Sequence, residues 1–171
     1  MEQGKIHLYY GDGKGKTTAA MGLALRAAGS GKRVVIVQFL KDGTSHEVQL
    51  LEKIANIQVL SGKVCAAFVF HMTEQQKKDT AILHTKNLQK ALQLPCDVLI
   101  LDEICASVAQ HVIDENLVKT LVCEKPAALE LVLTGREPAD YMLQQADYAT
   151  QMMARKHPYE KGTPARMGIE F

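Results

Sequence analysis

The chain has 171 residues, of which 47% are hydrophobic and 23% are charged, and its formal net charge is +1. This length suits one domain with one substantial core, and the composition is typical of a globular protein. The near-neutral charge favours neither nucleic acid nor a membrane as partner, and no run reaches the ~18 apolar residues of a spanning helix. The four cysteines are scattered, so we expect reduced thiols and a cytoplasmic protein.

Apolar strands and helical segments alternate along the first part of the chain. A strand predicted at 5–10 leaves no room for a signal peptide before it. A glycine-rich loop separates this strand from a helix that buries an alanine-rich face and ends at 29–31. The next predicted elements are an interior strand at 34–39, a polar loop at 41–46, a short helix at 47–54 and a short strand at 57–60.

The second part continues the alternation after an irregular segment at 61–72. A capping box at 73–76 predicts a long helix to about residue 93. The remaining elements are a buried strand at 96–103, a helix capped by Asp114, a strand at 129–133, a short helix near 141–143, an edge strand near 148–152 and a polar tail. This order predicts one α/β domain over residues 1–171, with a mostly parallel sheet flanked by helices.

The loop at 11–18 is the most informative motif, because it follows a strand and opens a helix. Glycines let backbone N–H groups surround phosphate, and the helix N-terminus adds positive potential. In such a loop Lys16 reaches the phosphates and Thr17 offers its hydroxyl to Mg²⁺. The loop is one residue shorter than the usual pattern, so we expect it to hold a triphosphate differently from an ordinary ATPase. The predicted phosphate-binding residues are Gly11, Asp12, Gly13, Lys14, Gly15, Lys16, Thr17 and Thr18.

Three further charged residues follow predicted strands. Asp102 and Glu103 end the strand at 96–103, and Arg136 follows the strand at 129–133. Open α/β sheets place ligands at the carboxyl ends of their strands. Either acid can hold Mg²⁺ opposite Thr17, and spacing alone does not decide between them. Arg136 can grip phosphate oxygens. A solvated strand end and a surface arginine are the alternative interpretations.

Aromatic residues stand out in the irregular segment, because Phe68 and Phe70 are two of only four phenylalanines. Taken alone, the residues favour packing in the core, although a wall over a flat ligand is the alternative. His84 lies on the apolar stripe of the predicted long helix, and we interpret it as a core histidine with satisfied hydrogen bonds.

Over nearly its whole length the chain resembles the ATP:corrinoid adenosyltransferases of the P-loop (RecA-like) type. The matching segments are GDGKGKTTAAMGLALRAAG, VVIVQFLK, LILDEI, ELVLTGREP and KHPYEKGTPARMGIEF. The short loop is itself a trait of that family. The tail is the most specific match, since general P-loop ATPases have nothing like it.

The resemblance implies a displacement at carbon. ATP lies in the loop in a reversed sense, Co(I) of the corrinoid attacks the ribose C5′, and triphosphate leaves. Lys16, Arg136 and Mg²⁺ stabilise the leaving charge. By the family match, Thr17 and Glu103 hold the metal, and Asp102 orients it.

The resemblance also implies how the cobalt is prepared. Aromatic residues remove its lower ligand, and the family's Phe-x-Trp reads Phe68-Val69-Phe70 here. Lys41 and Glu47 are expected to border the corrinoid. A homodimer and a reductase or flavodoxin-type electron donor are expected as partners. Some members have an N-terminal extension over the site, so in this chain the lid is expected to come from elsewhere.

Two other classes of function stay open at this stage. A P-loop phosphotransferase or ATPase acting on a small molecule would release ADP rather than triphosphate. A non-enzymatic carrier would bind ATP and corrinoid without turnover in the presence of a strong reductant.

Overall fold

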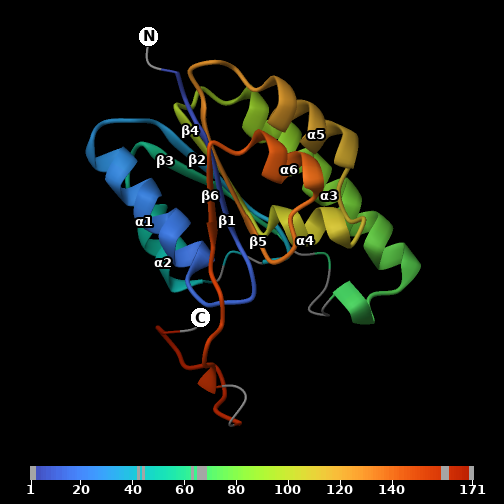
Figure 1. Ribbon diagram of the computed structural model, residues 1–171. Helices are drawn as coiled ribbons and strands as arrows, with labels where there is room; N and C mark the ends of the chain where they lie inside the picture. Colours follow the sequence, from blue (N-terminus) through green and yellow to red (C-terminus); the bar gives the residue numbers. More distant parts are fainter. Residues whose placement is uncertain are drawn as a thin grey trace.

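The structure is a computed structural model that describes residues 3–41, 43, 45–62, 64, 69–158 and 162–169. Strands and helices alternate along it (Figure 1). In chain order the elements are β1 (Ile6–Tyr10), α1 (Lys16–Gly29), β2 (Val34–Gln38), α2 (His46–Leu51), β3 (Ile57–Leu60), the 3-10 helix η1 (Val69–His71), α3 (Glu74–Gln93), β4 (Val98–Asp102), α4 (Ile104–Ala109), α5 (Glu115–Glu124), β5 (Glu130–Gly135), α6 (Asp140–Gln145) and β6 (Tyr148–Gln151).

One six-stranded sheet organises these elements, in the order β3-β2-β4-β5-β1-β6. Every neighbouring pair is parallel, which confirms the predicted sheet. Helices α1 and α2 lie on one face of the sheet and α3 to α6 on the other (Figure 1). Because all strands run the same way, the loops after β1, β2, β4 and β5 meet at one edge of the sheet.

The inner strands are apolar on both faces because each face of the sheet has its own core. Along β2, Val35 and Val37 belong to the cluster on one face, while Val34 and Ile36 belong to the cluster on the other. Strand β4 alternates in the same way. Burying such a side chain stabilises a fold by ~1.5–3 kcal/mol, so these strands hold the site-bearing edge on a rigid support.

Two helix starts follow their predicted caps. Thr73 Oγ1 accepts from the backbone N–H of Gln76 at 3.2 Å, and Gln76 Oε1 accepts from that of Thr73 at 2.9 Å. Asp114 Oδ1 accepts from the N–H of Asn116 at 3.0 Å and begins α5. The predicted starts of these two helices are therefore confirmed.

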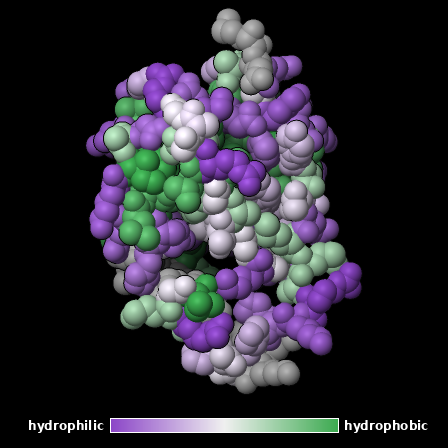
Figure 2. Space-filling view, turned by 90° about the vertical axis from the view of Figure 1, so that its left-hand side faces the viewer, coloured by the Kyte–Doolittle hydropathy of each residue, from purple (hydrophilic) through white to green (hydrophobic). Residues whose placement is uncertain are grey.

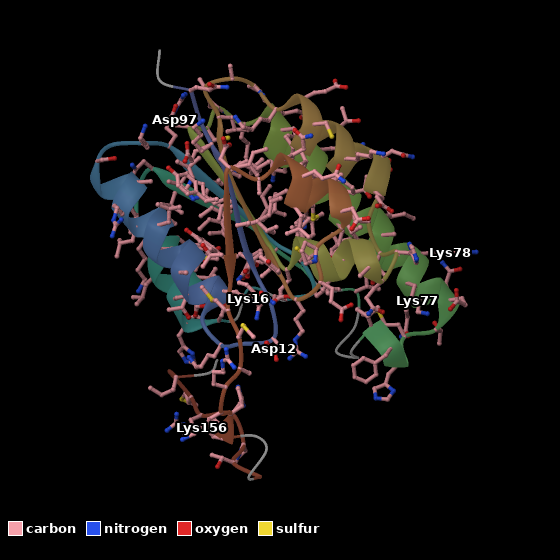
Figure 3. All side chains as sticks on the ribbon, in the orientation of Figure 1. Asp12, Lys16, Lys77, Lys78, Asp97 and Lys156 are labelled. Carbon is pink, nitrogen blue, oxygen red and sulfur yellow. The ribbon has the colours of Figure 1, made fainter. Side chains whose placement is uncertain are left out.

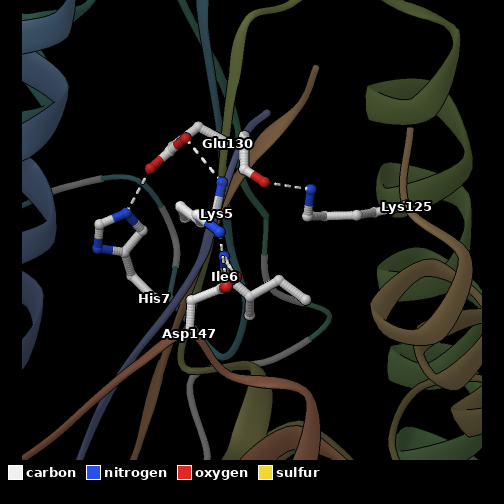
Figure 4. Close-up of polar contacts among 7 residues, drawn as sticks. Lys5, Ile6, His7, Lys125, Glu130 and Asp147 are labelled. Atoms are coloured by element: carbon white, nitrogen blue, oxygen red, sulfur yellow. Dashed lines mark hydrogen bonds and ion pairs between the residues drawn. The ribbon is translucent and has the colours of Figure 1, made fainter. Parts of the chain in front are cut away.

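Polar contacts join the ends at which β1, β5 and β6 begin (Figure 4). Glu130 accepts from the backbone N–H of Lys5 at 2.9 Å and contacts His7. Asp147 accepts from the N–H of Ile6 at 2.9 Å. These carboxylates align β1 with β5 and β6, so this end of the sheet fixes strand register.

Some features differ from the sequence predictions. Helix α4 was not predicted, because it is short and begins directly after β4 without an ordinary cap. Residues 69–71, in the segment expected to be irregular, form a short 3-10 helix. Cys96, Cys105 and Cys123 are free, as expected, while Cys65 lies outside the described residues. No helix in the described part of the chain is long and apolar enough to cross a membrane.

Candidate active site

The phosphate loop joins β1 to α1 and is packed against the chain that follows β6. The N–H of Gly13 donates to Met152 O at 2.8 Å, and the N–H of Ala154 donates to Asp12 Oδ1 at 3.1 Å. A Cβ on Gly11 would lie 2.4 Å from Met152 O. The loop therefore needs glycine where the two segments touch.

Lys16 is the first residue of α1, and its side chain is largely buried. Its Nζ donates to Gly13 O at 2.7 Å, so the ammonium lies against the loop itself. Burial lowers the pKa of Lys16, and the nearby carboxylates of Glu103 and Asp12 oppose that shift. Figure 3 shows Asp12 and Lys16 together at the lower end of the sheet, above the segment that carries Lys156.

Asp102 ends β4 and is 0% exposed. Its Oδ1 accepts from Thr17 Oγ1 at 2.9 Å and Thr134 Oγ1 at 2.8 Å. Its Oδ2 accepts from Lys41 Nζ at 2.7 Å and Gln38 Nε2 at 3.2 Å. Residues from β2, β4, β5 and α1 thus converge on one buried carboxylate, as expected for the carboxyl ends of parallel strands.

Glu103 lies beside Asp102 but faces the cavity. Its backbone has a positive φ of 63°, and its N–H donates to Thr134 Oγ1 at 2.9 Å. The left-handed conformation costs a non-glycine residue about 1–2 kcal/mol, so the fold holds Glu103 in this place at some expense of stability. Burial raises the pKa of Glu103, the charge of Asp102 raises it further, and Lys41, Lys16 and Arg136 oppose the rise.

Two cavities meet at this edge of the sheet. The larger, of about 1070 Å³, lies between the phosphate loop, α2 and the C-terminal segment, where Figure 2 shows a hollow. The smaller, of about 350 Å³, is mostly apolar and includes Leu40, Phe70 and His84. Glu103 and Arg136 belong to both walls. Binding cavities for small molecules span roughly 300–1,000 Å³, so both are large enough to hold a ligand.

Most predicted site residues come together around the larger cavity. Asp12, Gly13, Lys14, Gly15, Lys16, Thr17, Thr18, Lys41, Glu47, Glu103 and Arg136 line it. Asp102 lies behind this wall, and Gly11 contacts the chain after β6 instead. Residues of the tail, including Lys156 and Arg166, form the far wall.

Of the two predicted aromatic residues, the structure describes only Phe70. Phe70 is 72% exposed and lines the smaller cavity, so the core-packing interpretation is wrong for it. Phe68 lies outside the described residues.

His84 is a buried histidine, as expected: its Nδ1 contacts Val112 O at 2.9 Å and its Nε2 accepts from the N–H of Leu40 at 3.3 Å. Burial lowers the pKa of His84.

Comparison with known proteins identifies the family. The family model described as "ATP:corrinoid adenosyltransferase BtuR/CobO/CobP" matches residues 2–171. The chain belongs to this family. The corrinoid adenosyltransferase of Escherichia coli (strain K12) is 34% identical over 99% of this chain and 87% of its own length. Corrinoid adenosyltransferase CobA of Salmonella typhimurium has the same identity and coverage, and the Sinorhizobium enzyme is 33% identical over 99% of this chain and 81% of its own.

As a member of the corrinoid adenosyltransferase family, the chain carries out ATP-dependent adenosylation of corrinoids. Among solved structures, EssC (ATPases 2 and 3) of Geobacillus thermodenitrificans matches with a TM-score of 0.56 and 18% identity, covering 98% of this chain and 36% of that one. This likeness concerns the fold alone and agrees with the ATPase-like α/β sheet.

Sequence reasoning missed two residues that hydrogen-bond to the buried carboxylate of Asp102. Gln38 and Thr134 both donate to Asp102. Gln38 ends β2 and is paired with Asp102 in the sheet register, and Thr134 is the last residue but one of β5, on the other side of β4. A polar residue at the end of an otherwise apolar strand is the signal that identifies them.

Proposed function

We propose that the chain transfers the 5′-deoxyadenosyl group of ATP to Co(I) of a corrinoid and releases triphosphate. The observation that carries this proposal is the pair of adjoining cavities. One contains the phosphate loop with Lys16, and the other is mostly apolar and contains Phe70. A triphosphate suits the first cavity, and the apolar lining of the second suits one face of a flat macrocycle that extends beyond it, so that C5′ and cobalt meet near Glu103 and Arg136.

The chain's own part in the reaction is positioning and charge stabilisation. Cobalt donates an electron pair to C5′, the Co–C bond forms as the C5′–O bond breaks, and that bonding pair leaves with the triphosphate. Lys16 is proposed to turn from Gly13 O to the triphosphate oxygens, and Arg136 to approach them from the shared wall. Fixed cations at a developing charge lower the barrier, because they need no reorganisation during the reaction.

The donor atoms at the phosphate loop fit Mg²⁺. Thr17 Oγ1 and the carboxylates of Asp102 and Glu103 are all oxygen donors, which Mg²⁺ prefers. A second feature supports the fit: Gln38 Oε1 is buried beside Asp102 and has no hydrogen-bond partner among the described residues. Within the described chain no group of three or more His, Cys, Asp or Glu residues forms a complete metal cage.

Thr17 and Glu103 are proposed to hold Mg²⁺, with Asp102 behind them. Because the Thr17 hydroxyl donates its proton to Asp102, its lone pairs are directed away from that carboxylate. When bound, Mg²⁺ supplies positive charge to the leaving triphosphate.

Phe68 and Phe70 are proposed to cover the lower face of the corrinoid and displace its lower ligand. The exposed ring of Phe70 in the smaller cavity supports this role. Lys41 and Glu47 are proposed to border the corrinoid from the larger cavity. On the resemblance, we further propose a cytoplasmic homodimer that receives electrons from a reductase or a flavodoxin-type donor; the free thiols of the described cysteines fit a reducing compartment.

The test is to incubate the protein with cob(I)alamin, Mg·ATP and a chemical reductant and to follow visible absorption. We expect a light-sensitive Co–C product and an equal amount of triphosphate. ADP without that product would instead favour a phosphotransferase. Binding of both ligands without turnover would favour a carrier.

A further inference from the structure

The ammonium of Lys41 contacts two oxygens at the proposed metal site, one of them from the proposed ligand Thr17. Lys41 Nζ is 2.7 Å from Asp102 Oδ2 and 3.1 Å from Thr17 Oγ1. These two oxygens come from β4 and from the start of α1, so a single ammonium bridges the two elements that form the metal site. Asp102 is fully buried, whereas the Lys41 side chain is 30% exposed.

The backbone that carries Lys41 is fixed on both sides. The N–H of Phe39 donates to Asp102 O at 3.0 Å, and the N–H of Leu40 donates to His84 Nε2 at 3.3 Å. The N–H of Gly62 donates to Lys41 O at 3.3 Å. Leu40 itself has a positive φ of 59°. Only the side chain of Lys41 is therefore free to leave, and its four-carbon stem lies on the wall of the larger cavity.

We propose that Lys41 is a tethered cation that fills the metal position in the nucleotide-free protein and is displaced into the larger cavity when the metal enters. This inference rests on the metal site proposed above. A buried carboxylate without a cation is strongly destabilising, so Asp102 needs Lys41 when no metal is present. The two cations compete, because Lys41 Nζ and the metal would both need the lone pairs of the Thr17 hydroxyl and their charges repel at this distance.

Once displaced, the ammonium of Lys41 can contact the ligand. The ammonium then faces the same cavity as Lys14 and Arg136, where the anionic ligand is proposed to lie. The metal therefore binds in exchange for a cation that moves to the substrate. A cation lies close to Asp102 in both states, since Thr17, which would hold the metal, donates to this carboxylate.

The exchange predicts opposite effects of Lys41→Met on stability and on metal binding. Without metal the variant should melt at a lower temperature than wild type, because Asp102 has lost its cation. It should bind Mn²⁺ more tightly by about tenfold or more, because the metal no longer competes with a tethered ammonium. Mg²⁺ should therefore raise its melting temperature more than that of wild type.

The matched control is Lys78→Met, since Lys78 is an exposed lysine on α3 that lies well away from the phosphate loop (Figure 3). Free Mn²⁺ is measured by electron paramagnetic resonance without nucleotide, and melting is followed in EDTA and in Mg²⁺. Equal or weaker Mn²⁺ binding by Lys41→Met than by wild type would overturn the exchange while leaving the metal site intact. No Mn²⁺ binding by wild type would overturn the metal site and the exchange together.

A measurement on the wild-type chain covers the case in which Lys41→Met does not fold. Acetic anhydride labels exposed amines, and mass spectrometry gives the labelling of Lys41 relative to Lys78. Mg²⁺ should increase this ratio severalfold by releasing the ammonium from Asp102. A ratio that Mg²⁺ leaves unchanged contradicts the proposal.

Discussion

Replacing Asp102 by asparagine keeps the shape of the side chain but removes its charge. Much of the surrounding network can adapt. With the new NH2 in the place of Oδ2, the hydroxyls of Thr17 and Thr134 still donate to the remaining oxygen, and a flip of the Gln38 amide lets its unpartnered Oε1 accept from the NH2. The contact that has no substitute is the ion pair with Lys41.

The exposure of Lys41 gives the free energy of unfolding that is lost with this ion pair. A hydrogen bond to a charged group contributes roughly 1.5–3 kcal/mol. Because the Lys41 side chain is 30% exposed and regains water when released, we take a value near the lower end, about 2 kcal/mol. In a domain of this size each 1 kcal/mol shifts the melting temperature by about 2–4 °C. Asp102→Asn should therefore lower the melting temperature in EDTA by about 4–8 °C.

Glu103→Gln should have a contrasting effect. The carboxylate of Glu103 is partly buried beside Asp102, and both features raise its pKa. Its removal relieves repulsion, so the melting temperature should not fall. If Glu103 holds the metal, the Mg²⁺ concentration for half-maximal activity should rise by about 10- to 100-fold, the range known for changes around metal ligands.

The two variants are compared by thermal unfolding in EDTA and by Mg²⁺ titration of adenosylation, with Glu124→Gln, an exposed change on α5, as the control. We expect Asp102→Asn to dominate the stability measurement and Glu103→Gln to dominate the Mg²⁺ requirement. The reverse ranking in the Mg²⁺ titration would assign the ligand role to Asp102. A loss of less than 1 °C in Asp102→Asn would refute the reasoning about its buried charge.

Four further outcomes are expected. Lys16→Ala should lower the adenosylation rate by about 10²–10³, and near-normal turnover with Mg·ATP would exclude its role. Phe70→Ala should leave the melting temperature unchanged, because the ring is exposed, but should weaken the four-coordinate Co(II) spectrum with Mg·ATP bound; an unchanged spectrum in this variant and in Phe68→Ala would exclude the aromatic cover. Gly13→Ala places a Cβ 2.8 Å from Met152 O and should cost about 1–3 kcal/mol of stability and weaken ATP binding, as calorimetry can test. The pKa of His84 is lowered by burial, so the unfolded chain takes up that proton first and stability falls as the pH drops below about 6.5; melting curves of His84→Gln should lack this part of the pH dependence.

Much of the fold could be predicted because its local signals agree. The strands at β2 and β4 are apolar at every position but the last, and the long helix α3 has a full capping box. The sequence did not predict helix α4, because its N-cap is Glu103 in a left-handed conformation and no residue propensity indicates such a cap. That conformation is set by the tertiary structure, through the hydrogen bond from Glu103 N–H to Thr134.

The candidate site, too, could be predicted only in part. The loop residues and the strand-end acids could be located from spacing, because parallel strands bring their carboxyl ends together. The inward turn of Lys41 could not, since a lysine in a polar loop is expected to be solvated. Nor did the sequence indicate that Met152 follows β6 into contact with Gly13, because that approach depends on a strand pairing between distant parts of the chain.

The shared wall of the two cavities has a thermodynamic consequence. Ligands that fill both cavities meet at Glu103 and Arg136, so each alters the electrostatic field in which the other binds. Such coupling is reciprocal by necessity: the factor by which nucleotide changes corrinoid affinity equals the factor by which corrinoid changes nucleotide affinity. A titration of either ligand at two fixed concentrations of the other therefore measures the same coupling free energy from both directions, and replacing Arg136 should change both by one common factor.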